Sequence, residues 1–154
     1  MKYTAFDHSD GKQNMSSLIK KEIEESIKNS CDKGLPITSK NIRVEIISRL
    51  KSFGWPSSIL VSKHSDISIT SLKNETGICL QTGNMARMYA DLIKLQTLYL
   101  DNIIKTAAIL LPSSRLAKRL GSNIAQAERL INELQIFKKA YHAPTIIYAL
   151  EETK

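Results

Sequence analysis

Residues 66–84 read DISITSLKNETGICLQTGN, and apolar and polar side chains alternate on both sides of a central turn. Successive side chains of a strand point to opposite faces of a sheet, so this alternation predicts two half-buried strands. The run Lys-Asn-Glu-Thr at residues 73–76 supplies the turn between them. The stretch therefore predicts an antiparallel hairpin.

The same alternation allows three polar side chains of the hairpin to converge. Asp66 lies on the polar face of the first strand, and Cys79 and Gln81 share one face of the second. An acidic residue beside two alternating polar positions can hold a hard divalent cation, usually Mg²⁺, which would polarise a phosphate and activate water. Many ordinary hairpins carry such residues without any catalytic role, so the spacing alone leaves both interpretations open.

The rest of the chain alternates between helical and strand patterns. Apolar residues at helical spacing, preceded by capping residues, predict five helices, and short apolar runs predict the strands. The expected helices begin at Ser16, after Thr38-Ser39, at Asn84, at Ser114 and at Asn123. The expected strands cover residues 58–62, 66–72, 77–82, 103–111 and 145–150.

This order of elements predicts a mixed α/β fold with a central mixed β-sheet flanked by helices. We find no internal repeat, low-complexity tract or interdomain linker, so residues 16–154 are expected to form a single domain. Residues 1–15 are polar and lack periodicity, which predicts a flexible N-terminal arm.

The charge of the chain favours a polyanionic partner. The 154 residues include 22 Lys and Arg against 15 Asp and Glu, which gives a formal net charge of +7. Clustered cations gain free energy by displacing counterions from a phosphate backbone, although a solvated basic surface would give the same count.

The N-terminus and the cysteine content indicate a cytoplasmic protein. No apolar segment resembles a secretory signal, and no apolar run approaches the roughly 20 residues that span a bilayer. Cys31 and Cys79 are therefore expected to be free thiols in a reducing compartment, and no membrane contact is expected.

Residues 77–84 resemble the second catalytic strand of type II restriction endonucleases of the BamHI, BglII and BstYI group, which have the PD-(D/E)xK nuclease fold. Residues 85–100 are similar to the long helix of that group, and residues 105–112 to its next strand. Residues 50–55 are similar to the helix end before the catalytic hairpin, and the whole resemblance covers about residues 19–150. It implies a restriction-endonuclease-like fold.

The resemblance also implies roles for residues of the hairpin. Asp66 would match the first metal-binding aspartate and Gln81 the third polar position, where the BglII subgroup also has glutamine. Cys79 stands where the group has a catalytic glutamate, and a neutral thiol is a poor ligand for Mg²⁺. Metal-dependent phosphodiester hydrolysis is therefore either retained with a substitute acid or lost. Glu75 in the turn is the candidate substitute, and Glu22 or Glu25 could supply an outer contact.

The resemblance further implies a homodimer that binds double-stranded DNA. It places the start of the helix after the catalytic strand at the major groove, so Asn84 and Arg87 are candidates for contacts with bases and phosphates. Arg115, Lys118 and Arg119 in a locally basic segment are candidates for contacts with the DNA backbone. The alternative function is a catalytically inactive protein-interaction module, of the immunity or inhibitor type, built on the same fold.

Overall fold

A five-stranded mixed sheet forms the centre of the molecule in the computed structural model, which describes residues 1–31 and 34–153. In spatial order the strands are β1 (Lys2–His8), β7 (Thr145–Glu151), β6 (Thr106–Pro112), β5 (Thr76–Leu80) and β4 (Ser71–Lys73). The three central strands β5, β6 and β7 are parallel, and β4 and β1 pair antiparallel at the two edges. Strands β2 (Ile59–Leu60) and β3 (Ser68–Ile69) form a separate antiparallel pair.

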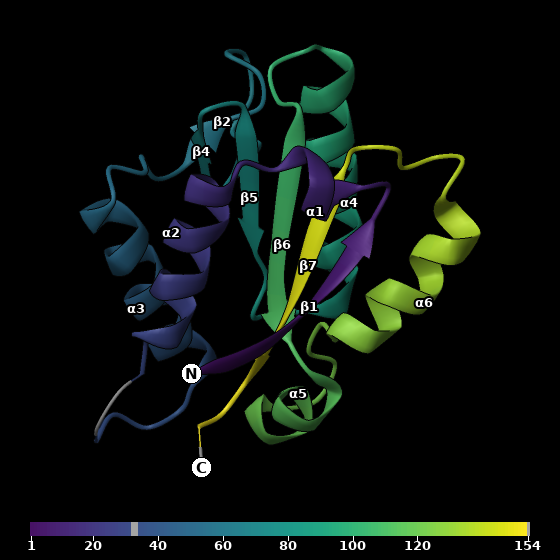
Figure 1. Cartoon of the computed structure of the whole chain (residues 1–154). Coiled ribbons are helices and arrows are strands. Elements are labelled where there is room, and N and C mark those ends of the chain that lie inside the picture. Colours follow the sequence, from purple (N-terminus) through teal and green to yellow (C-terminus); the bar gives the residue numbers. More distant parts are fainter. Residues whose placement is uncertain (32–33, 154) are drawn as a thin grey trace.

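Helices cover both faces of this sheet (Figure 1). The helices are α1 (Gly11–Asn14), α2 (Ser17–Lys28), α3 (Ser39–Ser52), α4 (Met85–Leu100), α5 (Ser114–Leu120) and α6 (Ala127–Phe137). Helices α2 and α3 lie on one face, and α4 and α6 lie on the other, with α5 near the carboxyl ends of the parallel strands. This arrangement confirms the predicted mixed α/β fold with a helix-flanked sheet. No helix of the described residues is both long and apolar enough to span a membrane.

Burial explains why the central strands have so few polar residues. Strand β6 has the sequence TAAILLP and is buried along its whole length, as expected of a parallel strand with helices on both faces. Strand β5 divides its side chains between two cores: Ile78 and Leu80 pack toward α2 and α3, whereas Cys79 packs toward α4 and α6.

Most predicted helix starts are confirmed by cap hydrogen bonds. The Ser16 hydroxyl accepts a bond of 3.3 Å from the backbone N–H of Ile19, and Thr38 accepts one of 3.1 Å from Asn41. Helix α6 is an exception, because it begins at Ala127 instead of Asn123. Asn123 lies in a turn, and the residues after it pair with the loop after β5, where the Ala125 N–H donates a 2.9 Å bond to the Gly83 carbonyl.

The expectation of a flexible arm over residues 1–15 is wrong. Strand β1 pairs with β7 over its full length, from Lys2 opposite Glu151 to His8 opposite Thr145. The N-terminal ammonium group donates a 2.9 Å bond to the Ser30 carbonyl, which fixes the start of the strand. The polar composition of β1 reflects its position at the edge of the sheet, where about half of its side chains face solvent, so it lacks the apolar run that identifies central strands.

Candidate functional site

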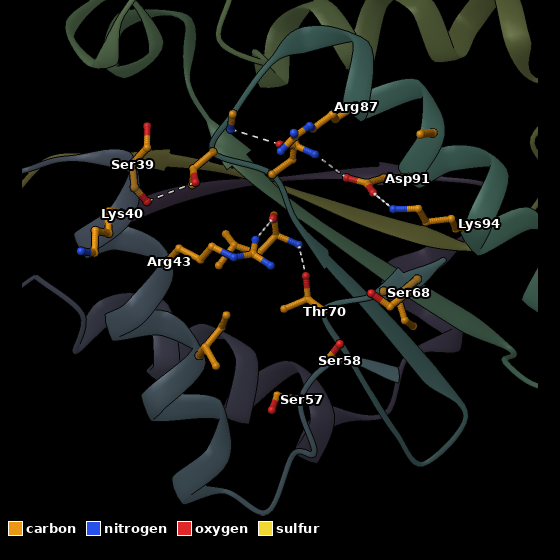
Figure 2. A pocket seen from close by; sticks show the side chains of 17 residues that line it. Ser39, Lys40, Arg43, Ser57, Ser58, Ser68, Thr70, Arg87, Asp91 and Lys94 are labelled. Atoms are coloured by element: carbon orange, nitrogen blue, oxygen red, sulfur yellow. Dashed lines mark hydrogen bonds and ion pairs between the residues drawn. The ribbon is translucent and has the colours of Figure 1, made fainter. Parts of the chain in front are cut away.

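A cavity of about 740 Å³ opens at the carboxyl end of β5, between α3 and α4 (Figure 2). We call it the β5 pocket. The carboxyl ends of parallel strands are a common place for ligand sites, because the loops that follow the strands meet there. The described residues that line it are Ser39, Lys40, Arg43, Ile47, Ser57, Ser58, Ser68, Ile69, Thr70, Leu80, Gln81, Thr82, Gly83, Arg87, Ala90, Asp91 and Lys94.

Gln81 lies at the floor of the β5 pocket, where β5 ends. Its backbone N–H donates a 2.8 Å bond to the Leu110 carbonyl, which extends the pairing with β6 by one residue beyond the strand. Its side-chain amide donates a 2.8 Å bond to Asp91 through Nε2 and accepts a 3.1 Å bond from the Gly83 N–H at Oε1. The side chain of Gln81 is therefore held at both its nitrogen and its oxygen atom.

Helix α4 supplies the wall opposite α3. Arg87, Asp91 and Lys94 follow one another at intervals of four and three residues, which puts them on one face of the helix. Asp91 is buried, and its Oδ1 atom forms an ion pair of 3.0 Å with Lys94 Nζ. Asp91 thus binds Gln81 with one oxygen and Lys94 with the other.

Helix α3 contributes Lys40 and Arg43 to the β5 pocket. The Arg43 Nη1 atom donates a 2.7 Å bond to the Leu80 carbonyl, so the guanidinium group reaches across to the end of β5. Both α3 and α4 begin at the pocket, and the partial positive charge of a helix N-terminus adds to that of the side chains. Four cationic side chains and one carboxylate line the pocket, which leaves a net charge of +3.

Thr70, not Asp66, lies beside Gln81. The Oγ1 atom of Thr70 accepts a 2.9 Å bond from the Leu80 N–H, whereas Asp66 is exposed in the connection before β3 and does not line the pocket. The predicted hairpin exists, but its first strand is interrupted at Thr70: residues 68–69 pair with β2, and residues 71–73 pair with β5. The interruption carries Asp66 away from β5.

Cys79 lies in the core beneath the pocket. The side chain is 1% exposed and packs in the apolar cluster on the α4 and α6 face. Burial raises the pKa of the thiol well above its usual value, and the negative charge of Asp91 raises it further. Cys79 is therefore a neutral thiol near pH 7, which suits neither a nucleophile nor a ligand of Mg²⁺.

The structure does not bring the other candidate acids to this pocket. Glu75 lies in the turn at the opposite end of β5, about 20 Å along the strand from Gln81, and pairs with Lys105 at 2.9 Å. Glu22 is buried elsewhere, where it accepts a 2.7 Å bond from the Trp55 indole and pairs with Lys73 at 2.8 Å. Glu25 pairs with Lys21 on the outer face of α2.

The donor set of the pocket does not fit a divalent metal ion. Mg²⁺ prefers carboxylate oxygens, and the lining residues offer one carboxylate, which is already paired with a lysine. The Leu80 carbonyl, Thr70 Oγ1 and Gln81 Oε1 each accept a hydrogen bond from the protein itself. Among residues 1–31 and 34–153, no group of three or more His, Cys, Asp or Glu side chains could hold a metal ion.

The candidate DNA contacts occupy two exposed places near the carboxyl ends of the parallel strands. Asn84 caps α4 by accepting a 2.7 Å bond from the Ala86 N–H, and Arg87 lines the β5 pocket. Arg115, Lys118 and Arg119 are exposed on α5, which directly follows β6 (Figure 1). Arg119 forms an ion pair with Glu152.

Sequence reasoning missed the pocket residues Lys40, Arg43, Thr70, Asp91 and Lys94. The spacing of Arg87, Asp91 and Lys94 was a usable signal, because it places three charged residues on one face of a helix. Leu92, which follows Asp91, is buried, so that face lies next to the core. No local pattern marks Lys40 or Arg43, because they reach the pocket only through the packing of α3 against the sheet.

The central mixed sheet with helices on both faces is the restriction-endonuclease-like fold that the resemblance in residues 77–84 implies. The model of the restriction endonuclease BglII/BglIII family matches residues 5–150, so the chain belongs to this family. A comparison with curated protein sequences found no match.

Two solved structures of BglII share the fold. The crystal structure of restriction endonuclease BglII complexed with a DNA 16-mer superimposes with a TM-score of 0.87 at 17% identity, covering 99% of this chain and 79% of that chain. Free BglII superimposes with a TM-score of 0.78 at 18% identity, covering 99% and 81%. Both findings agree with the resemblance seen in residues 77–84.

Proposed function

We propose that this protein binds double-stranded DNA at the face formed by the carboxyl end of β5, the start of α4 and helix α5. The observation that carries the proposal is the net charge of +3 in the β5 pocket, at the place where the sequence predicted a nuclease site. The family match and the DNA complex of a protein with the same fold support DNA as the polyanion.

Within this function, Arg87 would contact a phosphate or a guanine, and Asn84 would contact an adenine edge. Both are exposed at the first turn of α4, and Asn84 uses only its side-chain oxygen for the helix cap, which leaves its amide N–H groups for a partner. Arg115, Lys118 and Arg119 would follow the phosphate backbone beside that turn.

Hydrolysis by a metal-assisted mechanism is not part of the proposed function. Asp66 and Glu75 would have to act as ligands, but both lie outside the pocket, and Cys79 is a buried neutral thiol. Without two carboxylates, the site lacks the negative charge that holds Mg²⁺ against a phosphate. The proposal therefore assigns no catalytic role to the expected residues Asp66, Cys79, Gln81 and Glu75. It assigns the β5 pocket a role in DNA binding instead.

A homodimer is the assembly that we expect, and an exposed apolar groove supports it. Helices α4 and α6 border this groove, with Ile93 68% exposed and Phe137 39% exposed. Ile136, which precedes Phe137 on α6, is 75% exposed. Adjacent exposed apolar side chains are typical of protein contacts, so the same groove is also what an immunity or inhibitor type of module would use for a different protein.

Salt-dependent DNA binding and plasmid cleavage together test the proposal. We expect the affinity for duplex DNA to fall steeply with salt. The logarithm of the association constant should decrease with the logarithm of the salt concentration, with a slope of about −0.9 for each phosphate contacted. Supercoiled plasmid should stay intact in Mg²⁺ and in Mn²⁺, both for the natural chain and for Asp66→Ala. Cleavage by the natural chain that Asp66→Ala abolishes would show a working nuclease. Absence of DNA binding at low salt would favour the protein-interaction alternative.

A further inference from the structure

We infer that the β5 pocket binds a phosphate group directly, through its cationic side chains and without a divalent metal ion. The inference rests on the proposed DNA binding, since a phosphate of DNA is the expected ligand. Its source is either an internal phosphodiester or the phosphomonoester at a DNA end, and both present anionic non-bridging oxygen atoms to the pocket.

The first argument is the placement of Arg43. Its Nη1 atom donates a 2.7 Å bond to the Leu80 carbonyl, so the guanidinium group of this exposed residue is anchored at the carboxyl end of β5. A guanidinium group has five N–H donors, and this bond uses one of them. The remaining donors suit the oxygen atoms of a phosphate, which arginine binds in a bidentate geometry.

The second argument is the state of the single carboxylate. Asp91 would repel a phosphate if its charge were unpaired, but Lys94 lies 3.0 Å from Oδ1 and the Gln81 amide lies 2.8 Å from Oδ2. Both partners are donors, and the carboxylate is buried at 6% exposure. Asp91 is the one acid among the described lining residues, so Lys40, Arg43 and Arg87 have no second carboxylate there to offset their charge.

The third argument is the hydrogen-bonding character of the floor. Thr70 Oγ1, the Leu80 carbonyl and Gln81 Oε1 each accept a hydrogen bond from the chain, and all three are neutral oxygen atoms that bring no negative charge for a divalent cation. The cationic N–H groups, in contrast, are donors, and donors are what an oxyanion requires. The same set of residues therefore disfavours a metal ion and favours a phosphate.

The primary test is a calorimetric titration of inorganic pyrophosphate in the presence of EDTA. We expect binding by the natural chain and a roughly tenfold loss of affinity in Arg43→Gln, because a hydrogen bond between charged groups is removed. Arg49→Gln is the matched control, since Arg49 is an exposed arginine of the same helix that does not line the pocket. Equal affinity of the two variants would overturn the inference.

The change in pyrophosphate affinity caused by Asp91→Asn is a second test, because a phosphate site and a metal site predict changes in opposite directions. Removing the negative charge should tighten pyrophosphate binding, because Lys94 loses its ion-pair partner and is released toward the cavity, which raises the net positive charge of the pocket. If Asp91 held a metal ion that bound the phosphate, pyrophosphate would bind the natural chain only after Mg²⁺ is added, and Asp91→Asn would abolish that binding. Either that result, or weaker binding by Asp91→Asn than by the natural chain in EDTA, would contradict the inferred phosphate site.

Duplexes with 5′-hydroxyl and with 5′-phosphate ends identify the source of the phosphate. Equal, Arg43-dependent binding of both duplexes supports an internal phosphodiester, and Arg43-dependent binding of the 5′-phosphate duplex alone supports a DNA end. Duplex binding that Arg43→Gln leaves unchanged would overturn the pocket as the phosphate site while leaving DNA binding intact. Failure of the natural chain to bind either duplex would instead overturn the proposed function.

Discussion

Gln81 donates a 2.8 Å hydrogen bond to Asp91, and this contact joins the end of β5 to the middle of helix α4. Both side chains are at least nine-tenths buried. Water therefore cannot replace either partner in this hydrogen bond without a structural change. Gln81 was predicted from the sequence as a site residue, whereas Asp91 was not. Their contact fixes the floor of the β5 pocket.

Replacing Gln81 with leucine should destabilise the protein. The change removes one hydrogen bond from a buried carboxylate and leaves the Gly83 N–H without its acceptor, so we expect a loss of about 1–3 kcal/mol. Urea unfolding measures it. Gln135→Leu on the exposed face of α6 is the control and should change the free energy of unfolding by less than about 0.5 kcal/mol. Equal effects of the two changes would show that the bond has no structural role.

The Glu22 network should be a second point of sensitivity. Glu22 accepts bonds from Trp55 Nε1 and Lys73 Nζ, and Lys73 also donates a 2.6 Å bond to the Phe53 carbonyl, so the group joins α2, β4 and the end of α3. Glu22→Ala should lower the free energy of unfolding by about 3 kcal/mol, because it leaves a partly buried ammonium group and an indole N–H unpaired.

Glu25→Ala on the same helix is the comparison for Glu22→Ala. The Glu25 pair with Lys21 is 3.9 Å long and largely exposed, which makes a change of about 0.5 kcal/mol or less the expected result. Chemical denaturation of both variants, followed by tryptophan fluorescence, gives the difference. Similar midpoints for the two variants would mean that the buried network adds nothing to stability.

The two cysteines should differ in reactivity toward a thiol reagent. Cys79 is buried and its pKa is raised well above normal, so its thiol should react only when the protein unfolds. Cys31 is partly exposed, and burial and the charge of Glu45 raise its pKa, so its rate should keep rising with pH beyond the range of an ordinary thiol. Colorimetric titration at several pH values should count one fast thiol in the native protein and two in denaturant. Two fast thiols in the native state would contradict the burial of Cys79.

Two added carboxylates should convert the pocket into a metal site. Thr70 lines the pocket, and Cys79 lies in the core beneath it, near Thr70 and Asp91. Thr70→Asp combined with Cys79→Glu therefore adds two acids close to the end of β5. We expect the melting temperature of the double variant to rise with millimolar Mn²⁺ and that of the natural chain to stay constant. Asp66→Glu, which alters an acid outside the pocket, is the control. A metal-dependent rise in the natural chain would show that its own donors suffice.

The sequence predicted most of the fold because its central elements have strong local signals. Residues 77–82 show strand alternation, residues 85–100 form a long amphipathic helix, and Ser16 and Thr38 are effective caps. Strand β1 was missed because an edge strand needs few apolar residues and depends on pairing with β7 near the far end of the chain. Local periodicity carries no information about that pairing.

The candidate site was predicted only in part, for a similar reason. Gln81 and Arg87 were identified because they belong to the stretch that resembles the family. Asp66 was assigned on the assumption of an unbroken hairpin, and the interruption at Thr70 removed it from the pocket. Arg43 reaches the pocket through the packing of α3 on the sheet, a tertiary contact between residues 37 positions apart in the chain.

Equilibrium binding of one short duplex, measured in EDTA and again in Mg²⁺ with the integrity of the DNA checked at the end, tests the central claim most directly. If the protein binds DNA through cationic side chains and holds no catalytic metal, the affinity in the two buffers should agree once ionic strength is matched, and the duplex should remain intact. Binding that requires Mg²⁺, or cleavage of the duplex, would contradict a metal-free DNA-binding site and show a functioning nuclease.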